Sequence, residues 1–397
     1  MIFDNFPKVS PAGMPARVFL AFLASAGLFY INILPAIVDG LIQALGFSNQ
    51  QAGAVASANI YGAASGALLI VFLIKHINWR FASLLFLCVL IGIDLASILV
   101  ASPAALVAIR FLHGFVGGML VGTGFSVIAR TIQPDRTFGV LLFVQFGFGG
   151  VGVMFIPGMV PHFGTSILFL SLIAFSTLTL LMLPFLPAYA VEKRPQNAGT
   201  PRAIRWLPLC LTLAALFLFQ AANNGLYAYI IGLGESYGMT QDYITTTLGI
   251  SAWLGVAGAG LVILISDRFG YFKTLLIGIG LTTLANWALQ YSETPLIFFA
   301  ANALVGITWA FSISYLLGLA SRFDAVGQMA ALGGFASKMG LASGPAVAAL
   351  VMGKDNYQLI IWVAVGTLVF CILTVIAPSL AQDRQAANSA PVQGLRA

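Results

Sequence analysis

The sequence has very few charged residues. Asp, Glu, Lys and Arg make up 8% of its 397 residues, 60% are hydrophobic, and the mean hydropathy is +0.98. A soluble globular chain carries about 25% charged residues, so this chain lacks the polar surface that water-soluble folds need on every side. The composition excludes an ordinary soluble protein and predicts a chain embedded in a lipid bilayer.

The sequence also lacks motifs of metal, nucleotide and hydrolytic chemistry. It contains no H-E-x-x-H motif, no Cys/His metal spacing and no Walker loop. Its three cysteines, Cys88, Cys210 and Cys371, fall in separate apolar runs as packing groups. "GFGGVG" from Gly147 fits G-x-G-x-x-G and "GESYG" from Gly234 fits G-x-S-x-G, but neither belongs to a predicted strand–turn–helix. We therefore expect no cofactor, no metal site and no enzymatic activity.

Long apolar runs dominate what is present. Each is about 20 residues long, which as a helix crosses roughly 30 Å of hydrocarbon. The alternating ten-residue segments of a β-barrel do not occur. The runs lie at 17–38, 50–74, 80–101, 103–129, 137–160, 164–187, 206–233, 243–265, 271–291, 295–318, 326–352 and 357–378. The sequence thus predicts an all-α polytopic membrane protein with twelve transmembrane helices.

Lys and Arg are distributed asymmetrically about these runs. If the N-terminus is cytoplasmic, Lys354 is the one basic residue in the outer loops, and Arg110 and Lys338 lie within helices. The remaining Lys and Arg residues all fall on the cytoplasmic side. The net charge of +6 is therefore a topology signal rather than a sign of nucleic-acid binding. We expect a multi-pass protein of the cell inner (plasma) membrane with both termini cytoplasmic.

The chain divides near its middle. The segment 189–205 is polar and separates two six-helix halves, 1–188 and 206–380, and the polar segment 381–397 is expected to be a disordered cytoplasmic tail. An offset of 188 residues places Gly152 on Gly340 and Pro157 on Pro345. Two parallel repeats of six helices are typical of transporters.

Two motifs add a family resemblance. "SDRFGYFK" matches the loop motif G-x-x-x-D-[RK]-x-G-R-[RK] at Asp267, Arg268 and Gly270, although the first-half copy reads "IKHINWRF" and lacks the aspartate and glycines. "IRFLHGFVGGMLVG" is similar to a fourth-helix motif with Arg110 as its arginine. With its 6+6 topology, the chain resembles the major facilitator superfamily over essentially its whole length.

The resemblance implies a secondary transporter that works by alternating access. In this fold helices 1, 4, 7 and 10 line a central cavity, and helices 2, 5, 8 and 11 shape it. Asp267 and Arg268 would belong to a gating latch in the loop motif.

Two cations lie on helices that the resemblance places at the cavity. Lys338 is on the eleventh predicted helix and Arg110 on the fourth. Intramembrane ionisable residues usually face a water-filled path, and two cations favour an anion there. Arg110 could instead pair with Asp94 on the third helix, and Lys338 could bond to backbone carbonyls. We expect a small organic anion of the carboxylate type as substrate.

Three further ionisable groups are candidates for coupling or gating. His113 lies one turn from Arg110 and could carry a proton or serve as a hydrogen-bonded packing residue. Asp94, on the third predicted helix, lies at a depth similar to that of Arg110. Asp39 lies at the outer mouth of the first helix, as a solvated cap or a proton site. Acidic residues are scarce on the inferred cavity walls, and proton antiport usually depends on such carboxylates. The sequence therefore favours co-transport of an anion and a proton, or facilitated exchange, over proton antiport.

Polar residues in the predicted helices provide the other binding candidates. The stretch "FQAANNGLYAY" puts several on one face of the seventh helix, and Asn-Asn-Gly is expected to interrupt that helix. The alternative for these amides is interhelical bonding. The candidates for substrate binding, besides Arg110 and Lys338, are Gln220, Asn223, Asn224, Tyr227, Tyr30, Tyr61, Gln145, Trp309 and Tyr315.

The sequence therefore predicts a monomeric transporter of a small organic anion in a lipid bilayer, with protons as a second possible partner. The alternative is an exporter of drugs or other lipophilic compounds with the same fold. A membrane enzyme would need paired intramembrane carboxylates or a nucleophile dyad, and a receptor would need a soluble output domain. Neither pattern occurs in the sequence.

Overall fold

The computed structural model describes residues 6–74, 76–189, 205–265, 268–323 and 328–389, and within these ranges the chain is built from helices without strands. The helices are α1 (Met14–Ala26), α2 (Phe29–Asn32), α3 (Leu34–Leu45), α4 (Asn49–Leu73), α5 (Trp79–Ile98), α6 (Pro103–Ile128), α7 (Pro134–Phe163), α8 (Ser166–Met182), α9 (Trp206–Ala228), α10 (Ile230–Ser236), α11 (Gln241–Ile265), α12 (Gly270–Ala288), α13 (Pro295–Ser321), α14 (Gln328–Met352) and α15 (Tyr357–Ser389), with short 3₁₀ turns η1 (Leu183–Phe185) and η2 (Leu289–Tyr291). The predicted all-helical fold is confirmed.

Eleven of these helices are long and apolar enough to cross a membrane. The first predicted span is divided among α1, α2 and α3. Gly27 and Leu28 form a turn at the first break, and Ile33 leaves helical geometry at the second, with φ −106° and ψ 20°. Pro35 follows the second break and cannot donate a backbone hydrogen bond to Ile31. The first span is therefore present as three segments rather than as one continuous helix.

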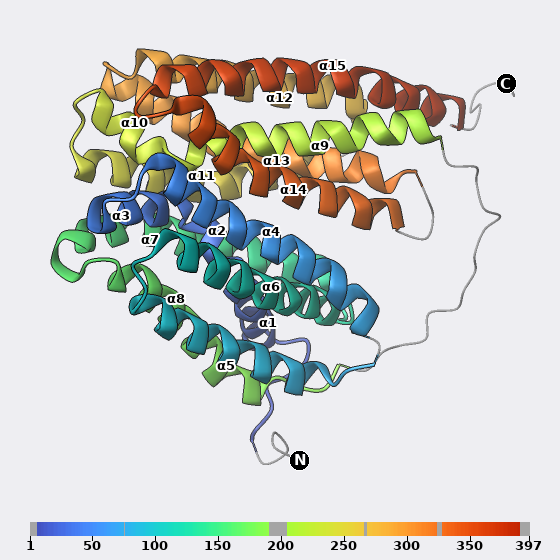
Figure 1. The fold of residues 1–397 in the computed structure, drawn as a ribbon. Coiled ribbons are helices and arrows are strands. Elements are labelled where there is room, and N and C mark those ends of the chain that lie inside the picture. Colours follow the sequence, from blue (N-terminus) through green and yellow to red (C-terminus); the bar gives the residue numbers. More distant parts are fainter. Residues whose placement is uncertain (1–5, 75, 190–204, 266–267, 324–327, 390–397) are drawn as a thin grey trace, which may run out of the picture.

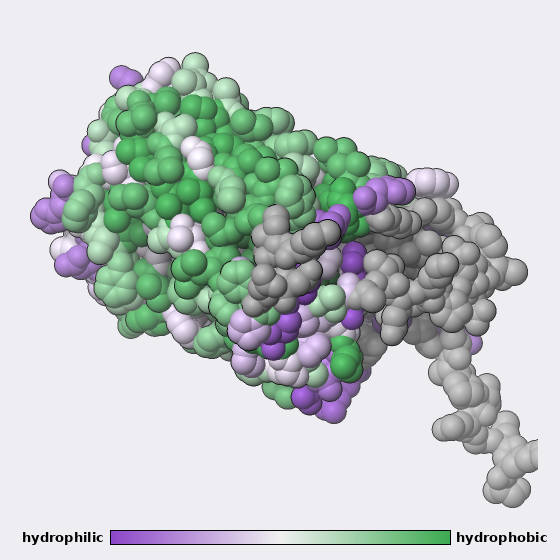
Figure 2. Space-filling model, turned by 90° about the horizontal axis from the view of Figure 1, so that it is seen from below, coloured by the Kyte–Doolittle hydropathy of each residue, from purple (hydrophilic) through white to green (hydrophobic). Residues whose placement is uncertain are grey.

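The outer surface suits a lipid environment. Figure 2 shows hydrophobic residues over most of the visible flank and hydrophilic residues gathered toward its two ends. Large apolar side chains such as Phe72, Ile277 and Leu350 are exposed on the surface of the molecule. In water this surface would be unfavourable, whereas in hydrocarbon it needs no polar partner.

The helices form two groups that meet along two seams. α1–α8 pack on one another, as do α9–α15, and the groups meet where α4 contacts α14 and α7 contacts α11. Figure 1 shows the two groups close together near α3 and α10 and spread apart toward the end where the chain begins and finishes. We call the end near α3 and α10 the opposite end, and the end where the chain begins and finishes the terminal end.

Hydrogen bonds join the two groups toward the opposite end. Tyr229 Oη donates to the Asn49 carbonyl at 2.9 Å, and Tyr61 Oη lies 2.7 Å from Ser343 Oγ. Each bond involves α4 or the residue at its start. Gly53 on α4 allows the close approach, because a Cβ there would collide with Tyr229 Oη. Hydrogen bonds and close packing thus hold the two groups in contact at the opposite end.

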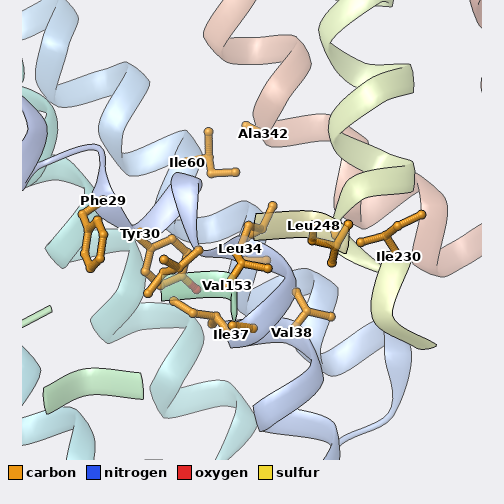
Figure 3. Packing of buried hydrophobic residues seen from close by; sticks show 14 of the residues in the cluster. Phe29, Tyr30, Leu34, Ile37, Val38, Ile60, Val153, Ile230, Leu248 and Ala342 are labelled. Carbon is orange, nitrogen blue, oxygen red and sulfur yellow. The ribbon is translucent and has the colours of Figure 1, made fainter. Parts of the chain in front are cut away.

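The buried core continues across this junction. Leu34, Ile37 and Val38 of α3 gather with residues from both groups, among them Ile60 of α4 and Leu248 of α11 (Figure 3). The broken first span therefore lies at the centre of the packing between the groups.

The C-terminal end of the chain differs from the prediction. α15 continues to Ser389, so residues 381–389, predicted to be disordered, are helical. Asp383 accounts for this, because its carboxylate accepts hydrogen bonds from Tyr271 N at 2.7 Å and Phe272 N at 2.9 Å, at the start of α12. A carboxylate is favourable at a helix N-terminus. Most of the predicted linker, 190–204, and residues 390–397 lie outside the described residues.

Candidate functional site

A cavity of about 250 Å³ lies between the two groups of helices. Its wall comes from α2, α7, α9, α11, α13 and α14, together with Leu28. Much of the wall is apolar, including Ile31, Phe146 and Leu248. A mainly apolar concave space with a few polar groups is typical of small-molecule sites.

The polar part of the wall is uncharged among the described residues. It consists of amides, hydroxyls and one indole: Asn32, Gln145, Gln220, Asn224, Tyr227, Ser251, Asn302 and Trp309. Of the residues predicted to bind substrate, Gln145, Gln220, Asn224, Tyr227 and Trp309 line this cavity. The structure brings these five together from three helices.

Gln220 is held from both sides. Trp309 Nε1 donates to Gln220 Oε1 at 2.6 Å, and Gln220 Nε2 donates to Ser337 Oγ at 2.9 Å. The two bonds fix the orientation of the amide and join α9 to α13 and α14. Because the side chain is already ordered, binding of a solute to this amide costs little further conformational entropy.

Tyr227 closes the cavity against the broken first span. Its hydroxyl donates to the carbonyl of Asn32 at 3.3 Å, at the point where α2 ends. Asn32 Nδ2 donates in turn to the carbonyl of Gln145 at 3.3 Å. The Tyr227 ring meets Trp309 edge-on, with centroids 5.8 Å apart. The break in the first span thus supplies a backbone acceptor beside the cavity.

Lys338 adjoins this wall without being part of it. It follows Ser337, the partner of Gln220, and precedes the lining residue Leu341 by one helical turn. Its side chain is half-buried. No hydrogen bond or ion pair joins it to another residue in the described part of the chain. A lysine without a counter-charge therefore lies next to an uncharged cavity, on its terminal-end side.

Arg110 does not line the cavity, which corrects the prediction that it faces the substrate path. Its Nη1 lies 2.7 Å from Asp94 Oδ1, with both side chains fully buried, and Nη2 also donates to Ser97 Oγ. The guanidinium packs over the Phe169 ring at 4.9 Å. The ion-pair alternative therefore holds in this structure, because α5 and α6 pack with these two side chains face to face.

His113 belongs to the same buried cluster. Asn59 Nδ2 lies 2.9 Å from His113 Nδ1 and donates to the Arg110 carbonyl at 3.1 Å. Because an amide N–H can only donate, Nδ1 is the acceptor and the proton of the neutral ring is on Nε2. Nε2 lies 3.3 Å from Asp94 Oδ2. This arrangement favours the packing role over proton carriage.

Asn223 also lies away from the cavity wall. Its Nδ2 donates to the Phe219 carbonyl at 2.8 Å, and its Oδ1 accepts from Asn286 Nδ2 of α12 at 3.2 Å. The predicted interruption at Asn-Asn-Gly is wrong, because α9 runs to Ala228 and the break comes at Tyr229. At this break the Tyr229 hydroxyl donates to the carbonyl of Asn49 on α4, in the other group of helices.

The three remaining tyrosine candidates lie outside the lining. Tyr30 is buried against His113, with ring centroids 6.2 Å apart. Tyr61 joins α4 to α14 through Ser343. Tyr315 packs on Tyr271 near the terminal end. Tyr61 therefore contributes to closure, and the other two to packing.

The remaining coupling and gating candidates are Asp39, Arg268 and Asp267. Asp39 is buried at 7% exposure, and Gln43 Nε2 donates to both of its oxygens at 3.0 Å, so it is not a solvated cap. Arg268 is exposed in the turn before α12. Asp267 lies outside the described residues. In the part of the chain that the structure describes, no three His, Cys, Asp or Glu residues are grouped as a metal site.

Ser251 and Asn302 line the cavity but were not predicted. Asn302 is an amide inside an otherwise apolar run, a signal that the sequence carried. Ser251 had no such signal, because serines are common in membrane helices that pack closely.

Comparison with known proteins gives a consistent result. A family model described as Major Facilitator Superfamily matches residues 18–323. The nucleoside transporter NupG is similar in structure, with a TM-score of 0.68 at 15% identity, over 91% of this chain and 98% of that one. A D-xylose-proton symporter has a TM-score of 0.68 at 14% identity, over 90% and 96%. The human organic anion transporter MFSD10 (TETRAN) has a TM-score of 0.60 at 16% identity, over 91% and 98%. At such identities the likeness concerns the fold.

Proposed function

The chain belongs to the Major Facilitator Superfamily, and on that premise we propose that it carries a small organic anion across the membrane by alternating access. The two units that move would be the six-helix bundles 1–188 and 206–389, joined through the linker. We also propose that it acts as a monomer in the inner (plasma) membrane with cytoplasmic termini. The terminal end would then face the cytoplasm, and this structure would be the inward-facing state.

One observation carries the anion proposal: Lys338 has no counter-charge among the described residues and adjoins a cavity whose described wall is uncharged. A charge within a membrane helix is costly unless it is compensated. A carboxylate substrate would compensate it, so the loaded site would be more stable than the empty one. Arg110 plays no part in this proposal, since Asp94 already neutralises it.

Proton coupling belongs to the same proposal. A proton that moves with the anion would remove net charge from the transport cycle. Uptake driven by a pH gradient would then be abolished by a protonophore.

A neutral polar solute is the second candidate. The amides of Gln220, Asn224 and Gln145, with the Trp309 ring, suit a solute that combines hydroxyls with an apolar or aromatic face. Two of the similar structures are named for a nucleoside and for xylose. The lipophilic exporter predicted as an alternative would rely on the apolar part of the same wall.

Proteoliposomes containing the purified protein separate these functions. We expect unlabelled carboxylates to inhibit uptake of a labelled carboxylate, and nucleosides and sugars to leave it unchanged. Saturable uptake of a nucleoside or sugar, with no uptake of any carboxylate, would replace the anion with a neutral substrate. Dye efflux without either activity would favour the exporter.

A further inference from the structure

Pro345 lies inside α14 and removes one backbone hydrogen bond from it. A proline has no N–H, so the carbonyl of Leu341, four residues earlier, lacks its intrahelical donor. Asn224 Nδ2 on α9 donates to this carbonyl at 2.7 Å. The two helices come close enough because glycines face each other, and a Cβ on Gly344 would lie 2.7 Å from Gly225 N.

The bond to Leu341 decides which way the Asn224 amide points. If the amide were flipped, Oδ1 would face the carbonyl oxygen, and two acceptors would meet without a hydrogen between them. Oδ1 is therefore held away from α14. It has no hydrogen-bond partner in the described part of the chain, although Asn224 is 0% exposed. A buried acceptor of this kind is costly unless a donor reaches it.

Ser251 on α11 also has an unpaired polar atom. Its Oγ is buried and has no hydrogen-bond partner among the described residues. Serines in helices usually bond to a carbonyl one turn back, as Ser343 does to Met339. Of the buried side-chain atoms without a partner, Asn224 Oδ1 and Ser251 Oγ are the two that belong to residues of the cavity wall.

We infer that Asn224 and Ser251 form a hydrogen-bonding subsite that selects solutes carrying an O–H or N–H donor. The inference rests on the proposed function and narrows it, so that the substrate class becomes hydroxylated or N–H-bearing carboxylates rather than simple alkyl or aryl acids. Lys338 would take the carboxylate, and Asn224 Oδ1, which can only accept, would take the donor.

The buried, unpaired acceptor explains why the preference should be large. A solute that fills the cavity without supplying a donor leaves Asn224 Oδ1 unpaired, at the desolvation cost of a buried acceptor. Acids without a donor should therefore bind more weakly than acids of the same skeleton that have one.

Matched pairs of acids test this with the purified full-length protein. The pairs are propionate and lactate, cyclohexanecarboxylate and quinate, and benzoate and 4-hydroxybenzoate, each also offered as its methyl ester. In any pair that binds, we expect the hydroxylated acid to bind about tenfold more tightly, as measured by equilibrium titration.

Two variants assign the preference to the subsite. Ser251→Ala removes one of the two unpaired groups. Pro345→Ala restores an N–H that competes for the Leu341 carbonyl, so the Asn224 amide is freed to turn while no group of the wall is removed. Both should lower the tenfold ratio. Ser171→Ala on α8, whose hydroxyl bonds to its own helix, should leave it unchanged.

The outcomes distinguish the two proposals. Equal binding of parent and hydroxylated acids would overturn the subsite and leave anion transport standing. Preferential binding of hydroxylated esters, with no binding of the acids, would overturn anion transport and support the subsite. A high ratio that survives both Ser251→Ala and Pro345→Ala would overturn the assignment to these residues. Binding of no compound would overturn both.

Discussion

Arg110 Nη1 lies 2.7 Å from Asp94 Oδ1, and both side chains are fully buried between α5 and α6. The pair has further contacts, since Ser97 accepts from the guanidinium and His113 Nε2 lies 3.3 Å from the second carboxylate oxygen. It fixes the packing of two helices that carry no other charges in their interior.

Removing one member of this pair should destabilise the fold. Asp94→Asn leaves the Arg110 charge uncompensated, at a cost of about 3–5 kcal/mol. Thermal unfolding in detergent measures the loss. The double variant Asp94→Asn/Arg110→Gln should recover part of it, because neither charge then remains. If the single variant unfolded at the wild-type temperature, the pair would not stabilise this half.

Lys338→Gln should abolish anion uptake while expression and unfolding temperature stay near wild type. The reason is that Lys338 has no partner to lose among the described residues, so removing its charge costs no native contact. Lys338→Arg keeps the charge and should retain part of the uptake. Wild-type uptake by the glutamine variant would contradict the assigned role.

Gly53→Val should open the opposite end. A Cβ at Gly53 collides with Tyr229 Oη and lies 3.0 Å from Ala349 Cβ, so the two helix groups cannot stay in contact there. A cysteine at Ser57, in a background without the three native cysteines, should then react faster with a membrane-impermeant maleimide added at that end.

Gly92→Val is the matched control, because a Cβ at Gly92 meets nothing within 4 Å. It should leave the labelling rate unchanged. Equal rates in the Gly53 and Gly92 variants would show that the α4–α14 seam is not what closes the opposite end.

Asp383→Asn should lower the free energy of unfolding by about 1 kcal/mol. The substitution removes the negative charge that accepts the Tyr271 and Phe272 N–H groups at the start of α12. Arg384→Gln, at an exposed neighbouring position, is the control and should change stability little. Identical denaturation of both variants would mean that the end of α15 does not cap α12.

Adjacent residues of α9 show where sequence reasoning ends. Asn223 and Asn224 are equivalent in the sequence, yet one bonds to Asn286 of α12 and the other lines the cavity. Successive residues of a helix point about 100° apart, so one of two neighbouring amides can face the cavity while the other faces a packed helix. Which one does so depends on the rotation of α9 against its neighbours.

Arg110 illustrates the same limit. Its charge and its depth could be read from the sequence, and so could the presence of Asp94 at a similar depth. Whether the guanidinium turned to the cavity or to α5 depended on the angle at which α5 and α6 pack.

The sequence by itself determined the helical membrane fold, its order of spans and most of the polar groups in the cavity. Apolar runs of membrane-spanning length have few other solutions, because backbone groups in hydrocarbon must be bonded within the segment. Only the tertiary structure decided which polar groups are already partnered. It paired Arg110 with Asp94, tied Gln220 to Trp309 and Ser337, and left Lys338 and Asn224 Oδ1 without partners among the described residues. The physical reason is that a hydrogen bond depends on angstrom-scale contact between helices far apart in the chain, which no local pattern encodes.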